Sequence, residues 1–480
     1  MNAPSVGLAL IVKDEEKHLR TLLASIDGAF DQVVLLDTGS RDKTVSVFRR
    51  WAKQQSAAHK DFTSKVERFK WIDDFAAARN AAQDLLDTEW QVWADADDEI
   101  VGAQNLRALA AQAPPDLIAF VCGYDYAQDQ HGNCACYLRR ERLVRAGTTK
   151  WVGRVHESQV FEGRAEDVDP SVVLWRHRKQ HALDASSGRN LKILNAWVEE
   201  EPDNTRVLGY LGTEHMVKGE FTEAIPYFER YLKLPDGWSE ERAQICRKLA
   251  VCGMAAGVID GAIKVAFDAI ALVPSWPDSY LSLAEAFHQK AEYDKTLFWV
   301  ERVLELGQPE SLLIINPLDY SLAPLVLKAS ALGALGRFEE ALAVSEQALR
   351  IVPDQPNLES ARRDWSASLK RNATAHTFIA AAEQLVAHDE QLKALTLIEK
   401  TVPYYATDHP EVVAMRSKLR ERIRPLLEPD EYAEHYATGG SKPEDFIDDE
   451  NVQPLGDSLP RCAFLLEGIG EQLEEIGAAA

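Results

Sequence analysis

Long apolar runs are missing from this sequence of 480 residues, and with them the usual mark of a membrane-spanning helix. Such a helix needs about 20 consecutive apolar residues, and no run here approaches that length. The N-terminus has no basic segment ahead of its short apolar run at 6–12, which ends directly in Lys13, Asp14 and two glutamates. We therefore expect neither a membrane span nor a signal peptide.

Cysteine is also scarce, with six residues scattered over the chain. This number is too small for the disulfide scaffold of a compact secreted domain. Cys134 and Cys136 are the one close pair in the sequence, and no second cysteine or histidine pair follows them at the spacing of a zinc site. We predict a reduced protein in the cytoplasm.

Basic residues are in deficit, since 53 lysines and arginines stand against 76 aspartates and glutamates, for a formal net charge of −23. Nucleic acids need lysine and arginine to neutralise their phosphates, so DNA or RNA is a poor partner for this chain. An anionic membrane surface is unfavourable for the same reason. The hydrophobic fraction of 46% and charged fraction of 27% are those of a globular protein with a sizeable core.

Strand and helix patterns alternate through the first 100 residues. Short continuous apolar runs predict strands that are buried on both faces. The predicted strands of the N-terminal region are 6–12, 32–37, 65–71, 91–94, 117–126, 135–143 and 172–175. The predicted helices begin at Leu19, after Ser40 as N-cap, and at Phe75. This order favours an α/β fold with a mainly parallel, Rossmann-like sheet and helices on both faces.

Ligands of such sheets bind beyond the carboxyl ends of the strands. Asp37 and the acidic cluster 95–99 both lie at that edge. Asp95 and Asp97 follow a buried strand that opens into a loop, so both carboxylates can turn toward one divalent cation. Hard oxygen ligands suit Mg²⁺ or Mn²⁺. The alternative for this pair is an ordinary solvated loop.

From about residue 185 onward the pattern is helical and repetitive. An alanine followed by isoleucine or leucine recurs shortly before a proline, at Ala224 and Pro235, Ala262 and Pro274, Ala341 and Pro353, and Ala394 and Pro403. Segments 218–224 and 335–341 align closely, each with a short glycine turn, and a further helix pair is predicted at 280–306. Over roughly 190–420 the chain resembles a tetratricopeptide array, whose period is about 34 residues.

Stacked helix pairs form an extended concave surface that usually holds a peptide or protein. The alternative role of such a stack is a homodimer interface. The length favours two or three domains, and we predict an α/β domain at 1–184, an all-α repeat domain at 185–427 and an acidic tail at 428–480. Residues 428–450 alone hold nine acidic residues and one lysine.

Four motifs follow one another in the N-terminal region. They are IVKDEE at 11–16, LDTGSRDKT at 36–44, WIDDFAAARN at 71–80 and DADDE at 95–99. Together they resemble the family-2 glycosyltransferases of the GT-A fold, and in particular the subgroup with a tetratricopeptide tail. The segments GRVHE at 153–157 and RNLKIL at 189–194 are similar to later segments of that subgroup.

The resemblance implies a nucleotide-diphosphate sugar as donor, a UDP-sugar in the first instance. It also implies Mn²⁺ or Mg²⁺ held by Asp95 and Asp97, with His177 as third ligand. The cation would neutralise the charge of the departing diphosphate.

The donor pocket is expected to include seven residues: Val12, Lys13, Glu15, Asp37, Arg79, Asp95 and Arg178. Arg178 would clamp the pyrophosphate together with Arg176 and Lys179. The alternative for Arg79 is a surface salt bridge, and for Asp37 a turn-forming role.

An inverting transfer needs a base that takes the proton of the acceptor. Glu157 is the candidate from the resemblance, and His156 is the alternative, either as base or as a metal ligand. The sequence lacks the paired Glu-Asp of many family members at this point.

We therefore predict a metal-dependent glycosyltransferase whose helical repeats hold a protein or peptide acceptor. The alternative is a non-catalytic tetratricopeptide scaffold with a degenerate transferase domain. A nucleotidyltransferase is disfavoured, because the acidic segment 13–16 is unsuited to cradling a triphosphate.

Overall fold

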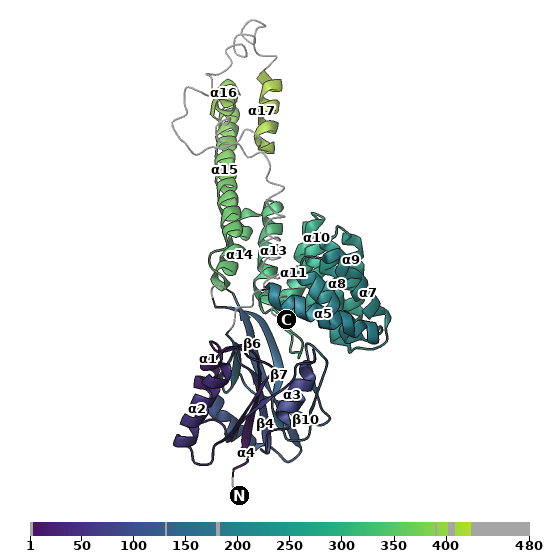
Figure 1. The fold of residues 1–480 in the computed structure, drawn as a ribbon. Coiled ribbons are helices and arrows are strands. Elements are labelled where there is room, and N and C mark those ends of the chain that lie inside the picture. The colour runs from purple at the N-terminus through teal and green to yellow at the C-terminus, as the bar shows by residue number, and fades with distance from the viewer. Residues whose placement is uncertain (1–2, 130–131, 179–182, 389–390, 402–408, 424–480) are drawn as a thin grey trace. The chain divides into compact units, whose positions relative to one another are not determined.

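The computed structural model describes residues 3–129, 132–178, 183–388, 391–401 and 409–423 (Figure 1). The chain divides into two compact units, the first running to Leu327 and the second beginning at Lys328. The first unit contains a sheet and a set of helix pairs, and the second is helical.

Strands β1 to β4 form the parallel half of a large sheet. They are β1 (Val6–Val12), β2 (Gln32–Asp37), β3 (Thr63–Arg68) and β4 (Trp90–Asp95). Their order is β3-β2-β1-β4, and the parallel registers set Ile11 opposite Asp95 and Val12 opposite Asp37. The carboxyl ends of β1, β2 and β4 therefore meet at one edge, as the alternation of strands and helices predicts.

Beyond β4 the sheet becomes mixed. Its further strands are β5 (Asp98–Val101), β6 (Leu117–Gln128), β7 (Cys134–Arg145), β10 (Arg164–Asp167) and β11 (Leu174–His177). β7 is antiparallel to both β4 and β6, β10 and β11 are parallel to β6, and β5 is antiparallel to β11. A separate hairpin pairs β8 (Lys150–Val152) with β9 (Ser158–Val160). The predicted α/β class is confirmed, with the parallel order concentrated in the first half of the domain.

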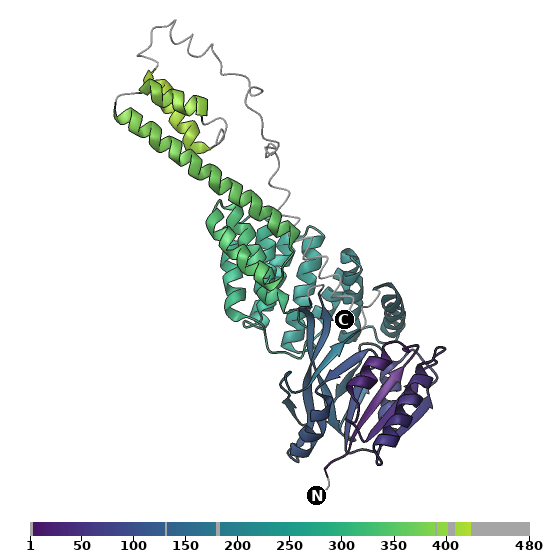
Figure 2. The same cartoon turned by 90° about the vertical axis from the view of Figure 1, so that its left-hand side faces the viewer.

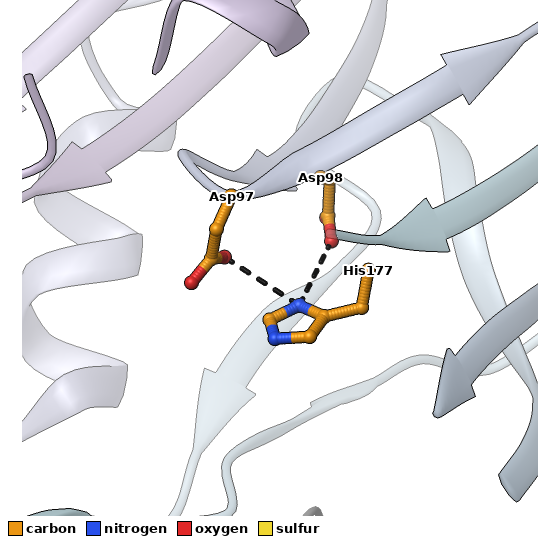
Figure 3. Close-up of side chains that lie close together, drawn as sticks. All are labelled: Asp97, Asp98 and His177. Carbon is orange, nitrogen blue, oxygen red and sulfur yellow. Dashed lines mark ion pairs between the residues drawn. The ribbon is translucent and has the colours of Figure 1, made fainter. Parts of the chain in front are cut away.

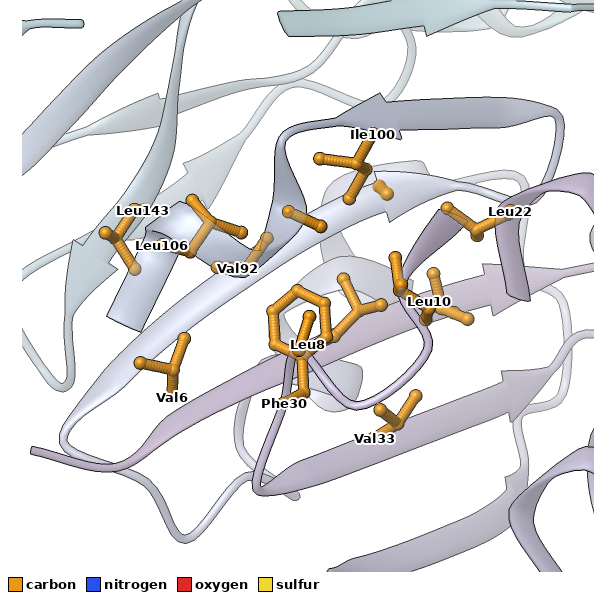
Figure 4. Close-up of a cluster of buried hydrophobic side chains, with 14 of the residues drawn as sticks. Val6, Leu8, Leu10, Leu22, Phe30, Val33, Val92, Ile100, Leu106 and Leu143 are labelled. Atoms are coloured by element: carbon orange, nitrogen blue, oxygen red, sulfur yellow. The ribbon is translucent and has the colours of Figure 1, made fainter. Parts of the chain in front are cut away.

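Helices cover both faces of the parallel half. Successive residues of a strand point to opposite sides of the sheet, and β1 and β2 are largely apolar and buried on both sides. They are α1 (Leu19–Ser25), α2 (Thr44–Ala58), α3 (Phe75–Gln83) and α4 (Leu106–Gln112), and Ala103–Asn105 form a 3-10 turn. Leu8 and Leu10 of β1 pack on the side of α1, α2 and α4 (Figure 4). Ala9 and Val34 pack on the opposite side, against Ala82 of α3.

The predicted helix cap at Ser40 is wrong. Helix α2 begins at Thr44, and the hydroxyl of Ser40 instead accepts from the backbone N–H of Asp14 at 3.0 Å. Asp42 Oδ1 accepts from the N–H of Thr44 at 2.9 Å. The hydroxyl therefore ties together two loops at the carboxyl edge of the sheet, a contact that no local sequence pattern indicates.

The helical part of the first unit consists of consecutive helix pairs. Its helices are α5 (Leu183–Glu200), α6 (Thr205–Val217), α7 (Phe221–Lys233), α8 (Ser239–Ala255), α9 (Ile259–Leu272), α10 (Pro277–Gln289), α11 (Tyr293–Leu306) and α12 (Leu318–Ser321). The pair predicted at 280–306 is present as α10 and α11. Ala224 and Ala262, two of the repeated alanines, are buried, as small residues are where closely packed helices meet.

The segment before α12 and α12 itself interrupt the repeat and lie against neighbouring helices. Gln244 of α8 donates to the carbonyl of Ile314 at 2.7 Å, and the Tyr320 hydroxyl donates to Asp278 of α10 at 2.9 Å. Every residue of α10 from Pro277 to His288 is buried, so this part of α10 offers no open face. Ile315 also exchanges two backbone hydrogen bonds, of 2.9 and 3.0 Å, with Tyr137 of β7.

The second unit begins at Lys328, within α13 (Ala323–Ala334). Its further helices are α14 (Phe338–Ile351), α15 (Pro356–Ala387), α16 (Gln391–Thr401) and α17 (Pro410–Ile423). Helix α15 is 32 residues long, and α16 and α17 pack beside it around a shared apolar cluster (Figure 2). Pro403 and the predicted acidic tail lie outside the described residues. Among the helices that are described, none is both long enough and apolar enough to span a bilayer.

The glycine at position 212 of α6 is needed for packing, because a Cβ there would lie 2.5 Å from a ring carbon of Phe228. We expect Gly212→Ala to lower the free energy of unfolding by about 1–3 kcal/mol, as overpacking does in a filled core. Gly188→Ala on α5 is the matched control, since nothing lies within 4 Å of its added Cβ and alanine favours a helix by about 1 kcal/mol. Thermal denaturation checks both, and equal midpoints would contradict the packing argument.

Candidate functional site

The acidic cluster lies where β4 turns into β5. Asp95 ends β4, Asp97 lies in the turn, and Asp98 begins β5. The antiparallel register between β5 and β11 sets His177 opposite Asp98. The observed strand β11, Leu174–His177, thus lies further toward the C-terminus than the predicted strand 172–175, and His177 is its last residue.

Asp97, Asp98 and His177 form a compact group of possible metal ligands, with their ligand atoms all within 4.8 Å of one another. His177 Nδ1 is 3.6 Å from an oxygen of each carboxylate (Figure 3). The His177 ring stacks on Tyr126 with ring centroids 4.9 Å apart. The Tyr124 hydroxyl donates to Asp98 Oδ1 at 2.6 Å, so neighbouring aromatic residues fix the orientation of both groups.

The electrostatics of this group favour a cation. Burial raises the pKa of Asp97 to about 7, and the carboxylates of Asp95 and Asp98 add to that rise while His177 opposes it. Two of the three donors are carboxylates, whose oxygens suit Mn²⁺ or Mg²⁺. A bound divalent ion would offset the repulsion among the carboxylates, so the residues present fit such an ion.

Asp95, one of the predicted metal ligands, is directed toward Arg79 of α3. Arg79 Nη2 donates to Asp95 Oδ1 at 2.8 Å, and Nε donates to Glu157 Oε1 at 2.5 Å. Burial alone would raise the pKa of Asp95, but the guanidinium groups of Arg79 and Arg142 outweigh it and hold the pKa below its ordinary value. Arg79 is therefore a buried bridge, and not the exposed salt bridge that the sequence left open.

Aromatic rings enclose the Arg79 guanidinium. It lies 4.6 Å from the ring centre of Trp93 and 4.9 Å from that of Trp151. The rings supply apolar walls and cation–π attraction in a desolvated position. Asn80, the next residue of α3, exchanges two 3.0 Å hydrogen bonds with the backbone of Trp151, so α3 and β8 are held together beside the bridge.

A second buried guanidinium, Arg142 of β7, lies behind Asp98. Its centre is 3.5 Å from the ring of Trp93 and 4.4 Å from that of Tyr124, and Nη1 is 3.9 Å from Asp98 Oδ2. Sequence reasoning missed both Asp98 and Arg142. The position of Asp98 directly after Asp97 was a usable signal, whereas nothing in the local sequence marks Arg142 as buried.

Glu157 and His156 lie in the five-residue loop 153–157 that joins β8 to β9. Glu157 is close to Asp95, because both bind Arg79. His156 turns toward the helices, where its ring stacks on Tyr210 of α6 with centroids 4.3 Å apart. The structure thus brings Glu157 to the acidic edge and directs the His156 ring to the first helix pair.

The other predicted donor-site residues lie along the same edge but differ in their contacts. Asp37 is buried, and its Oδ1 accepts from the N–H of Ser40 at 2.8 Å, which is the turn-forming role that the sequence left open. Lys13 is exposed, and Val12 is buried with its carbonyl accepting from Thr38. The N–H of Glu15 donates to Thr44 at 2.7 Å.

Arg178 is anchored at the same turn. Its N–H donates to the Asp97 carbonyl at 2.8 Å, and its guanidinium pairs with Glu99. Lys179 lies outside the described residues. Arg176 lies 3.8 Å from Asp125, so both described arginines of this segment pair with carboxylates of the protein. Cys134 and Cys136 are free cysteines, and burial raises the pKa of the Cys136 thiol to about 12.

We expect Arg79→Met to lower the free energy of unfolding by about 3–5 kcal/mol, because removing one partner of a buried ion pair leaves the other charges uncompensated. Arg50→Met, on the exposed side of α2, removes the same charge and should stay within about 0.5 kcal/mol of the parent. Chemical denaturation of the two variants measures the difference. Similar losses in both would show that Arg79 does not hold the site together.

Comparisons with known proteins agree with this architecture. Residues 8–141 match the family "Glycosyl transferase family 2", and residues 323–355 match "Tetratricopeptide repeat". A TPR repeat-containing protein of Synechococcus elongatus is 25% identical over 271 residues, which cover 54% of this chain and 64% of that protein. The SPbeta prophage-derived glycosyltransferase SunS of Bacillus subtilis is 24% identical over 259 residues, which cover 52% of this chain and 58% of SunS.

The chain thus spans roughly three fifths of the length of the curated relatives that it matches. A solved tetratricopeptide repeat protein from Parabacteroides merdae is 15% identical, covers 49% of this chain and 92% of its own, and has a TM-score of 0.31. A TM-score this low supports no conclusion about the fold or the function of the chain. The first matched segment lies in the region of the sheet, and the second lies in helices. The chain therefore has a glycosyl transferase family 2 domain followed by helical repeats of the tetratricopeptide type.

Proposed function

We propose that this protein transfers a sugar from a nucleoside-diphosphate sugar, a UDP-sugar in the first instance, to a protein or peptide acceptor. One observation carries the proposal. At the carboxyl edge of the sheet that contains the family 2 match at 8–141, a group of two carboxylates and an imidazole lies beside a glutamate that a buried arginine holds in place.

The proposed cation is Mn²⁺ or Mg²⁺, held by Asp97, Asp98 and His177. Asp98 joins the proposed ligands because its oxygen lies as close to His177 as that of Asp97 does. We propose that Asp95, which accepts a hydrogen bond from Arg79, lines the donor site. When bound, the cation supplies positive charge that stabilises the departing nucleoside diphosphate.

Glu157 is the proposed base. In an inverting transfer, the acceptor oxygen forms a bond to the anomeric carbon while the bond from that carbon to the diphosphate oxygen breaks, and the acceptor proton passes to the Glu157 carboxylate. Arg79 orients that carboxylate through the 2.5 Å hydrogen bond to Oε1. His156 is the weaker candidate, because its ring stacks on Tyr210 and its Nε2 lies 3.2 Å from Glu214.

The donor is proposed to bind along the edge that holds Val12, Lys13, Glu15, Asp37 and Arg178. Lys13 is exposed there and carries the positive charge that a diphosphate needs. Asp37 already accepts backbone hydrogen bonds from its turn, so its proposed part is to shape the base or ribose pocket.

The acceptor is proposed to approach from the side of the helix pairs that adjoin the site. Helices α5 and α6 pack against the loop that carries Glu157, with Val155 of that loop buried among their apolar residues. The residues of α10 from Pro277 to His288 are all buried, so an acceptor bound to the helical region of the first unit would use other helices.

Metal dependence is tested by Asp97→Asn. We expect this variant to lose the Mn²⁺-dependent rise in melting temperature that UDP-glucose, UDP-N-acetylglucosamine or GDP-mannose gives the parent protein, because it removes a charged ligand. Asp84→Asn, which changes an exposed aspartate, is the control and should keep the rise. A full rise in Asp97→Asn would speak against the proposed metal site.

The base is tested by Glu157→Gln, which keeps the oxygen that accepts from Arg79 but cannot take a proton at neutral pH. We expect donor turnover to fall about 100-fold or more, while the metal-dependent thermal shift with the same donor persists. Glu162→Gln, an exposed neighbour, should turn over normally. Failure of the parent protein to bind or hydrolyse any nucleotide sugar, with and without Mn²⁺, would favour the alternative of a non-catalytic scaffold.

A further inference from the structure

We infer that the first helix pair is a component of the candidate catalytic site, and that Arg206, Tyr210 and Glu214 of α6 are positioning residues that hold His156 and, through it, Glu157. The inference rests on the proposed function, in which Glu157 is the base. It assigns a role to residues that lie outside the transferase domain in sequence.

The backbone of His156 needs an external support. Its φ angle is +52°, in the left-handed region that residues other than glycine adopt only rarely. Such conformations persist when surrounding contacts over-determine them, and they gather at functional sites. Glu157 is the next residue, so the backbone angle of His156 sets the direction in which the Glu157 side chain leaves the loop.

Three side chains of α6 supply that support. The Arg206 guanidinium donates to the carbonyl of His156, Tyr210 stacks on the imidazole at 4.3 Å with 19° between the planes, and Glu214 Oε1 lies 3.2 Å from Nε2. These residues follow one another at intervals of four, which places them on one face of the helix. Asn190 of α5 donates to the same Glu214 oxygen at 3.1 Å, so α5 fixes the carboxylate that meets the imidazole.

The rest of the loop is fixed from both sides. Val155 is buried in an apolar cluster whose other buried members come from α5 and α6, namely Ile193, Leu194, Trp197, Val207 and Leu211. On the side of the sheet, Arg140 donates to the Glu157 carbonyl at 2.8 Å and Arg79 holds its carboxylate. The loop therefore connects the helices to the acidic edge with few residues between the two sets of contacts.

The proposed metal ligands stand on other elements. Asp97 and Asp98 belong to the turn and start of β5, and His177 ends β11. A change on α6 should therefore disturb the placement of Glu157 while it leaves the metal and donor contacts in place. This separates a positioning role from a general contribution to folding, because the turnover number should fall with little change in KM or in donor binding.

The test compares Tyr210→Leu, Tyr210→Phe and Tyr227→Leu in the full chain. Tyr227 is the matched control, because it packs against the same apolar cluster as Tyr210 but stacks on His215, at 5.5 Å with 7° between the planes, and not on His156. We expect Tyr210→Leu to lower the turnover number for donor hydrolysis with Mn²⁺ about tenfold or more. Tyr210→Phe, which keeps the ring, should recover most of that loss, and Tyr227→Leu should leave turnover unchanged.

A second measurement does not depend on activity. Amide hydrogen exchange of residues 153–160 should be faster in Tyr210→Leu than in the parent and unchanged in Tyr227→Leu, because exchange reports local opening. If the parent protein turns over no nucleotide sugar, the proposed function fails, and exchange still decides whether α6 clamps the loop. Parent-like exchange and parent-like turnover in Tyr210→Leu would overturn the inference.

Discussion

The placement of the Arg79 guanidinium between two carboxylates is the interaction on which the rest of the site depends. Asp95 and Glu157 come from different parts of the domain, and the planar guanidinium, with several fixed donors, holds both at once. The rings of Trp93 and Trp151 keep water away from it and so strengthen both contacts. Since Arg79 belongs to α3, the helix also sets where the acidic edge lies relative to the loop of Glu157.

The parallel half of the sheet and its acidic edge could be predicted because they follow from local patterns. The run Val6–Val12 is apolar throughout and is covered on both faces, and the acidic residues follow β4 directly. The meeting of Asp98 with His177 could not be predicted in this way, because it depends on the register of β5 against β11. The role of Ser40 could not be predicted for the same reason, because its hydroxyl accepts a hydrogen bond from Asp14 in a distant loop and does not cap the helix beside it.

Buried charge is the second limit of sequence reasoning here. Arg142 is fully buried, although it lies in a strand with Arg140 and Glu141 and reads as an exposed charge. Ring faces of Trp93 and Tyr124 accommodate it, and a pattern of polar and apolar residues does not encode that kind of contact. The helices show a similar case, because the repeat pattern locates α10 without showing that its residues from Pro277 to His288 are all buried or that Tyr320 of α12 donates to Asp278.

The backbone pairing of Tyr137 with Ile315 has a consequence for how the protein meets other chains. A strand with unpaired N–H and C=O groups at its border is a template on which a foreign polypeptide can add itself to a sheet. Here the helical half of the molecule supplies the missing neighbour at that position of β7. An added strand could not form these two backbone hydrogen bonds with Tyr137, because Ile315 already makes both of them, so sheet extension is blocked at this position.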